Sequence, residues 1–101
     1  MIAGGGASPV LMVSAGNFSQ NFNLDRPQLT VGRGSSNDIV IPESTVSGKH
    51  ATITNENGHF YLTDIGSTNG TFINNIRLQG KQMLKPGDTI RMGAAQMQFQ
   101  V

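Results

Sequence analysis

The chain has 101 residues, the length of one domain with one hydrophobic core. A formal net charge of +1 and a charged content of 13% argue against a strongly basic surface, so we expect neither nucleic acid nor a membrane as a partner. Cysteine is absent, which excludes disulfides, thiol nucleophiles and cysteine metal sites, and we expect a cytoplasmic location.

The first residues do not resemble part of a folded core. Residues 1–9 are rich in alanine, glycine and serine and lack the basic and apolar regions of a signal peptide. We predict a flexible linker or a cloning remnant there and a single domain over 10–101. Its first strand is expected at Val10–Val13, and a turn at Ala15–Asn17 leads to a returning strand at Gln20–Leu24.

The middle of the chain alternates between short strands and turns. Gln28–Arg33 alternates apolar and polar residues, the pattern of a half-buried strand, and a short apolar strand follows at Asp38–Ile41. Strands at Ala51–Thr54 and His59–Ile65 flank Asn55–Gly58. The Asn-Gly pair in that turn predicts a hairpin, because both residues tolerate a positive φ.

The last third of the chain continues the same pattern. Its predicted strands are Gly70–Ile73, Ile76–Leu78, Asp88–Met92 and Gln96–Val101. A second hairpin is expected at Asn74-Asn75, and a proline turn at Lys85–Asp88. No stretch has helical periodicity, so about ten short strands separated by turns predict an all-β sandwich.

Three side chains raise the question of catalysis, namely His50, His59 and Ser47. The histidines form no His-x-His or His-x-x-x-His pair for zinc. Ser47 and His50 lie three residues apart, but no acid is obviously placed to orient the imidazole. We therefore predict no enzyme activity, no metal site and no cofactor.

Loops rich in glycine, serine and asparagine separate the central strands, and they suit an anion. The planar fork of donors on Arg33 matches a phosphate monoester, and Ser47 adds a hydroxyl donor. Gly48 exposes its backbone N–H, and Asn69 offers a donor and an acceptor to an extended peptide. The residues alone also allow a solvated surface arginine, a turn-forming serine and a plain Asn-Gly turn.

The motifs in these loops match one family in order and spacing. They are Gly32-Arg33, Ser47-x-x-His50 and Thr68-Asn69-Gly70-Thr71, followed by the closing segment Pro86–Gly93. The chain therefore resembles the forkhead-associated (FHA) domain over residues 10–101. The resemblance implies a two-sheet sandwich of about eleven short, mostly antiparallel strands, with the ligand loops at one end.

The resemblance also implies a function and a role for each motif residue. It implies binding of phosphothreonine in an extended segment of a partner protein, in signalling by Ser/Thr kinases. The expected phosphate-binding residues are Arg33, Ser47, Gly48 and Thr68; the expected peptide-binding residues are Asn69 and Lys49; the expected structural residues are Gly32, His50 and Gly70. His50 is expected to bond across the loops that carry Arg33 and Ser47.

One position departs from the family pattern. Many members carry arginine or asparagine after the serine, whereas this chain carries Gly48, so one side-chain contact to the ligand is lost. This departure leaves room for an alternative on the same fold, a protein-assembly module that does not require phosphorylation. In either case we expect the isolated domain to be a monomer.

Overall fold

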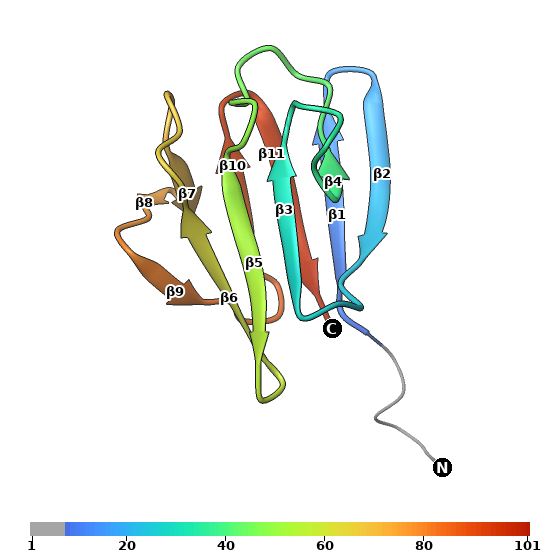
Figure 1. Ribbon diagram of the computed structural model, residues 1–101, viewed down its shortest axis with the longest axis vertical. Helices are drawn as coiled ribbons and strands as arrows, with labels where there is room; N and C mark the ends of the chain where they lie inside the picture. Colours follow the sequence, from blue (N-terminus) through green and yellow to red (C-terminus); the bar gives the residue numbers. More distant parts are fainter. Residues whose placement is uncertain (1–7) are drawn as a thin grey trace.

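The computed structural model describes residues 8–101, which form eleven strands and no helix (Figure 1). The predicted linker over 1–9 lies outside the described residues except for Ser8 and Pro9. The six-stranded sheet has the order β2 (Phe18–Asn23), β1 (Val10–Ala15), β11 (Ala95–Gln100), β10 (Thr89–Met92), β7 (Thr71–Ile73) and β8 (Ile76–Arg77). The five-stranded sheet has the order β4 (Ile39–Val40), β3 (Gln28–Gly32), β5 (Ala51–Glu56), β6 (His59–Asp64) and β9 (Lys81–Met83).

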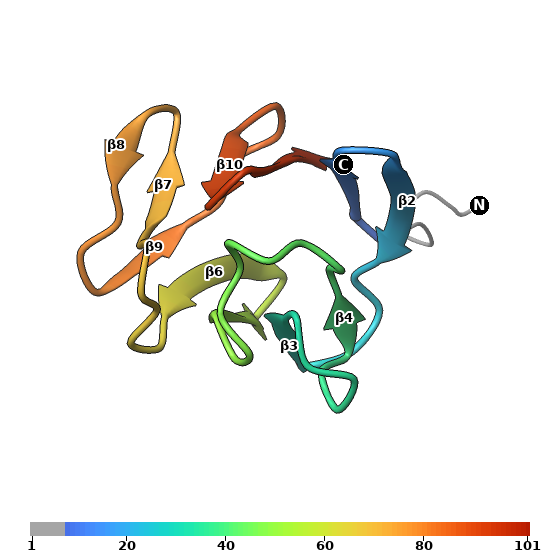
Figure 2. The ribbon, with the colours of Figure 1, turned by 90° about the horizontal axis from the view of Figure 1, so that it is seen from above.

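The two sheets face each other as two layers, which Figure 2 shows from above. Every strand pair is antiparallel except β3 with β4, which run parallel from Val31 opposite Ile39. The prediction of a mostly antiparallel all-β sandwich is therefore confirmed.

Alternation along the strands builds the core between the layers. In β11, Ala95, Met97 and Phe99 are buried while the glutamines between them face outward. Phe99 meets Phe60 of the other sheet with ring centroids 5.9 Å apart. Because side chains alternate between the two faces of a strand, every second residue joins the core and the others remain on the surface.

Both predicted hairpins are confirmed, and their backbone angles give the reason. Asn57 and Gly58 have φ values of 57° and 87° between β5 and β6. Asn74 and Asn75 have φ values of 51° and 69° between β7 and β8. Two successive positive φ values suit the right-handed twist of a hairpin, and asparagine and glycine adopt them at low cost.

Two regions differ from the sequence-based prediction. Strand β9 was not predicted, because all three of its residues are exposed and show no buried face; its pairing with β6 makes it a strand. The second strand runs over Phe18–Asn23 and not over Gln20–Leu24, because the turn is confined to Gly16 and Asn17. No helix in the described residues is long and apolar enough to cross a membrane.

The motif-bearing loops gather at one end of the sandwich, at the top of Figure 1. These are the loop between β3 and β4, the loop between β4 and β5, the loop between β6 and β7, and the turn between β10 and β11. The C-terminus lies at the opposite end. The sheets thus act as a rigid support for four loops at one edge, a common arrangement for a binding site.

Candidate functional site

Two loops of the site run alongside each other and are joined through their backbones. Arg33 N donates to Ser47 O at 2.9 Å, and Gly34 N donates to Gly48 O at 3.1 Å. The Asn37 side chain donates to Gly48 O at 2.6 Å and to Gly34 O at 2.8 Å. These bonds hold the β3–β4 loop against the β4–β5 loop, so Arg33 and Ser47 are neighbours in space.

Gly32 allows these two loops to approach. A Cβ atom added at Gly32 would lie 2.3 Å from Gly48 O and 2.9 Å from the side-chain nitrogen of Asn37. Because real Cβ atoms do not come that close to a backbone oxygen, only glycine fits at this position. The contact supports the structural role that we predicted for Gly32.

The guanidinium of Arg33 is anchored on one side only. Arg33 Nε donates to the carbonyl oxygen of Val46 at 3.1 Å, and the Val46 side chain is buried. In the described residues neither terminal amino group of Arg33 has a hydrogen-bond partner, and the side chain is exposed. One edge of the guanidinium thus sets its direction, while the other edge is available to a ligand.

Ser47 and Gly48 add two further donors at this edge. The Ser47 hydroxyl oxygen accepts a hydrogen bond from Thr68 N at 3.0 Å, so its own hydrogen is left to point to another acceptor. The backbone N–H of Gly48 has no acceptor among the described residues, and nothing lies within 4 Å of a Cβ built at Gly48. Gly48 thus adds a backbone donor beside the Ser47 hydroxyl, with no side chain of its own to cover it.

His50 is fully buried and connects the loops from below. Its Nδ1 accepts the backbone N–H of Ser47 at 3.0 Å, and its Nε2 lies 2.9 Å from Gly70 O. Since a carbonyl oxygen only accepts, Nε2 carries the proton and the imidazole is neutral. The side chain thus joins the Ser47 loop to the Gly70 loop, whereas the sequence-based expectation had it join the Ser47 loop to the Arg33 loop. The strand that leads to Arg33 is contacted by the backbone of His50, whose N donates to Val31 O at 2.8 Å.

Asn69 spans to the loop that precedes Ser47. Its side-chain nitrogen donates to Thr45 O at 2.8 Å, and the side chain is exposed. The Thr45 hydroxyl oxygen accepts a hydrogen bond from Ala94 N at 2.7 Å, and the same hydroxyl donates to Glu43 Oε2 at 2.8 Å. The side-chain oxygen of Asn69 accepts no hydrogen bond in the described residues and is left as an acceptor for a ligand.

Asp64 is a site residue whose role we did not predict. Its carboxylate accepts hydrogen bonds from Gly66 N at 2.9 Å, Ser67 N at 2.9 Å, the Ser67 hydroxyl and the Thr71 hydroxyl at 2.7 Å. Partial burial opposes its ionisation, but these hydrogen bonds prevail and lower the pKa of Asp64 to about 2. Asp64 therefore shapes the loop that presents Thr68 and Asn69. The sequence signal was Asp-x-x-Ser, a side chain able to fold back on the next turn.

The low pKa of Asp64 gives the first testable prediction. A carboxyl group with a lowered pKa stabilises the fold above its unfolded value of 3.8, and this contribution is lost as the pH falls toward about 2. Asp64→Asn should lower the free energy of unfolding by about 1–3 kcal/mol at neutral pH, because an NH2 group in place of one carboxylate oxygen cannot accept the partly buried hydroxyls of Ser67 and Thr71. In the variant, the melting temperature should also fall less than in the wild type when the pH is lowered from 3.8 to about 2. Asp25→Asn, at an exposed acid, is the control; equal effects of both changes would refute the role of Asp64.

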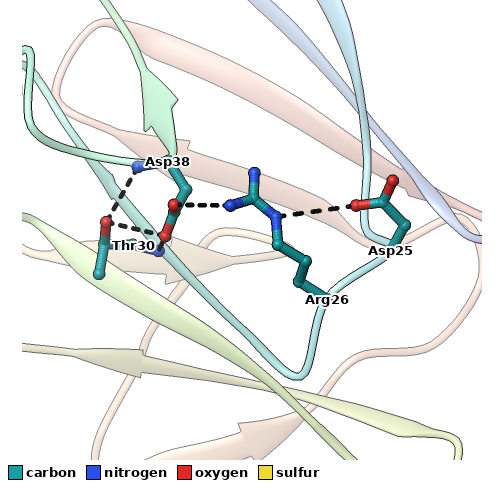
Figure 3. Close-up of polar contacts among 4 residues, drawn as sticks. All are labelled: Asp25, Arg26, Thr30 and Asp38. Carbon is teal, nitrogen blue, oxygen red and sulfur yellow. Dashed lines mark hydrogen bonds and ion pairs between the residues drawn. The ribbon is translucent and has the colours of Figure 1, made fainter.

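An exposed network of polar side chains supports the start of β4 (Figure 3). Asp38 accepts hydrogen bonds from Thr30 N at 2.9 Å and from Arg26 Nη1 at 3.1 Å. The bond from Thr30 N and the nearby Arg26 charge outweigh slight burial and lower the pKa of Asp38. Figure 3 shows Arg26 extending between Asp25 and Asp38. This network attaches β4 to β3 at the base of the ligand loops.

The structure brings nearly all predicted site residues to one end of the fold. Arg33, Ser47, Gly48, Thr68 and Asn69 meet through the contacts above. Lys49 is exposed and has no ion-pair partner in the described residues, which is compatible with either a ligand contact or a solvated charge. The described residues contain no group of three or more potential metal ligands.

Fold and loops together define a β-sandwich binding module that presents arginine, serine and asparagine at one end. A sequence model of the FHA domain matches residues 29–93, and the chain belongs to the FHA domain family. The predicted family is thereby confirmed.

Relatives and solved structures agree with this assignment. The chain is 38% identical over 93 residues to the oxoglutarate dehydrogenase inhibitor of Corynebacterium efficiens, covering 91% of this chain but 65% of that relative. It resembles the FHA domain of FhaA, solved in complex with the intracellular domain of Rv3910, with a TM-score of 0.84 and 29% identity over 92% of this chain and 100% of that one. It also resembles Mycobacterium tuberculosis EmbR, solved with a low-affinity phosphopeptide, with a TM-score of 0.81 and 27% identity over 91% of this chain and 24% of that one.

Proposed function

We propose that this FHA domain, extending over 10–101, binds phosphothreonine in an extended segment of a partner protein. It is a non-enzymatic module that recruits the protein to which it belongs to substrates of a Ser/Thr kinase. The observation that carries this proposal is the pair of unengaged donors on adjoining loops, the outer edge of the Arg33 guanidinium and the hydroxyl hydrogen of Ser47.

The chemistry of these donors matches a phosphate monoester. The phosphate group carries a charge of about −1.5 to −2 near neutral pH and has three strong acceptor oxygens. The two terminal amino groups of Arg33 form a planar fork that binds two such oxygens at once. The Ser47 hydroxyl and the Gly48 N–H supply further donors, and Thr68 lies next to them through its bond to Ser47.

The neighbouring groups suit the peptide on either side of the phosphothreonine. Asn69 has its nitrogen fixed on Thr45, so its carbonyl oxygen accepts a backbone N–H of the ligand. Lys49 adds a positive charge beside the loop for an anionic flank of the peptide. The ligand is thus held at the phosphate by charge and along the chain by hydrogen bonds to its backbone.

The comparisons support the binding step. EmbR was solved with a low-affinity phosphopeptide, and the FHA domain of FhaA was solved with the intracellular domain of Rv3910. We propose for this chain the same kind of contact, made in the cytoplasm without a cofactor by a domain that is a monomer when isolated.

The decisive experiment is a phosphothreonine peptide library screened with the wild-type domain. The selected sequence is then titrated by calorimetry in its phosphorylated and unphosphorylated forms. Phosphothreonine binding requires that only the phosphorylated form binds measurably. Equal binding of both forms would favour the phosphorylation-independent assembly module instead. Release of phosphate from the phosphopeptide, measured over time, would indicate an enzyme.

We also predict that the domain prefers phosphothreonine to phosphoserine, which titration of one peptide in both forms measures. The phosphate is identical in both, so the difference lies in one methyl group, whose burial is worth about 0.8 kcal/mol, or roughly fourfold in affinity. The β-branch of threonine also restricts χ1 before binding, so less rotamer freedom is lost. We expect phosphothreonine to bind at least several-fold more tightly, at low and at high salt, because the methyl contribution is not electrostatic. Equal affinities would indicate a generic phosphate site without a methyl pocket.

A further inference from the structure

Three neighbouring strands place two arginines and a phenylalanine in one row. Arg91 of β10 lies opposite Phe72 of β7, and Phe72 lies opposite Arg77 of β8. Directly opposed residues of antiparallel strands project from the same face. The residues on either side of Phe72 and Arg91 are buried, so the row Arg77–Phe72–Arg91 projects from the outer face of the six-stranded sheet. Figure 2 shows these three strands side by side in one layer.

The row is ordered by its own contacts. The guanidinium carbon of Arg91 lies 4.2 Å from the centroid of the Phe72 ring, a cation–π contact. Stacking of this kind uses the flat face of the guanidinium and leaves its N–H edge available for hydrogen bonds. Arg91 is therefore presented as a directed donor.

No carboxylate within the described residues neutralises either arginine of the row. The ion pairs of these residues involve only Arg26 and Lys81 among the arginines and lysines. The six acidic residues of the chain are occupied elsewhere, for example Glu56 with Lys81 and Asp88 with Asn74. The outward residues of β10, β11, β1 and β2 next to the row are uncharged, among them Gln96, Ser14 and Ser19. The sheet face thus has two positive charges and no negative one.

The row is continuous with the phosphate site. A Cβ built at Gly70 would lie 3.1 Å from the guanidinium carbon of Arg77, so the Arg77 guanidinium covers Gly70. Gly70 follows Asn69 directly in the chain, and its carbonyl oxygen is bonded to His50. A peptide that crosses Asn69 therefore reaches Arg77 next.

From this placement we infer that the row Arg77–Phe72–Arg91 binds an acidic segment of the same partner that carries the phosphothreonine. The inference rests on the proposed function and adds a second contact to it. Aspartate or glutamate carboxylates fit the guanidinium edges in a planar, two-pronged geometry, and Phe72 packs against the aliphatic stems of these side chains. A domain with a net charge of only +1 selects such a segment through this local charge and not through a general field.

Designed peptides test the inference with the selected phosphothreonine sequence as a base. One pair carries a run of Asp and Glu residues after the phosphothreonine, or Asn and Gln residues in the same positions; a second pair carries the runs before it. Each peptide is titrated against the wild type, Arg77→Gln with Arg91→Gln, and Lys85→Gln. The last variant is a control for the loss of a positive charge elsewhere on the surface, since Lys85 lies in the turn before β10 and has no ion-pair partner in the described residues.

We expect the acidic run to strengthen binding by about threefold to tenfold at low salt in one of the two orders, the size of one or two exposed ion pairs. The double variant should lose this gain and bind the neutral peptide as the wild type does, while Lys85→Gln keeps the gain. If the neutral phosphopeptide binds but the acidic run adds nothing, or if Lys85→Gln loses the gain equally, the inference is overturned and the proposed function stands. If no phosphopeptide binds, the proposed function fails and the inference fails with it. Binding of a labelled oligodeoxythymidine that is lost in the double variant would assign the row to nucleic acid and overturn the inference.

Discussion

Arg33→Ala should weaken the binding of the selected phosphothreonine peptide by about tenfold to a hundredfold, since a hydrogen bond to a charged group is worth roughly 1.5–3 kcal/mol. The loss has two sources. The phosphate loses the planar fork of donors, and the carbonyl oxygen of Val46 loses the Nε bond that orients the loop. Isothermal titration calorimetry gives the affinity, and thermal melts verify the fold.

Two further variants separate charge from geometry in this prediction. Arg33→Lys should recover only part of the affinity, because an ammonium group keeps the charge but lacks the fork. Lys85→Ala removes one positive charge from the connection between β9 and β10, which is bonded to Phe60 and Phe99 and not to the site loops, and should leave the affinity unchanged. If Arg33→Ala binds the phosphopeptide as tightly as the wild type with an intact fold, the phosphate does not bind at Arg33.

Gly32→Ala should destabilise the domain by overpacking the contact between two of the loops. Its Cβ would lie 2.3 Å from Gly48 O, so the backbone of one loop must move. Such overpacking costs typically about 1–3 kcal/mol, which lowers the melting temperature of a domain of this size by roughly 5–20 °C. The movement also separates the bonded pairs that join the two loops, Arg33 N to Ser47 O and Gly34 N to Gly48 O, so phosphopeptide affinity should fall as well.

The chain provides a matched control for this substitution. A Cβ built at Gly48, the other glycine of the same contact, meets nothing within 4 Å, and its φ lies outside the left-handed region. Gly48→Ala should therefore melt within about 4 °C of the wild type, as surface substitutions usually do. Similar melting temperatures for Gly32→Ala and Gly48→Ala would show that the close approach at Gly32 is not needed for stability.

Much of the fold was predictable because its signals are local. Alternation in Gln96–Val101 identified β11, since one face of that strand is buried and the other is exposed. The Asn57-Gly58 and Asn74-Asn75 turns were predictable because a positive φ is a property of the residue itself. The motif residues of the binding loops identified the family through their order and spacing along the chain.

Other features depend on residues that are far apart in the chain. The polar segment Lys81–Met83 becomes strand β9 only because the edge of β6 is available to pair with it. The His50 side chain connects Ser47 to Gly70. Gly70 lies twenty residues after His50, and no local pattern specifies that partner. For the same reason the sequence-based expectation named the Ser47 loop correctly as one partner of His50 but gave the Arg33 loop, and not the Gly70 loop, as the other.

The sequence by itself determined the fold class, the hairpin turns and the choice of the residues that we propose for phosphate binding, because backbone preference and side-chain chemistry belong to single residues. Only the tertiary structure decided which groups remain available. The Arg33 edge and the Ser47 hydrogen face outward because Val46 and Thr68 engage the rest of each side chain. The row Arg77–Phe72–Arg91 exists only because three strands pair in one register, which places distant side chains on one face of the sheet.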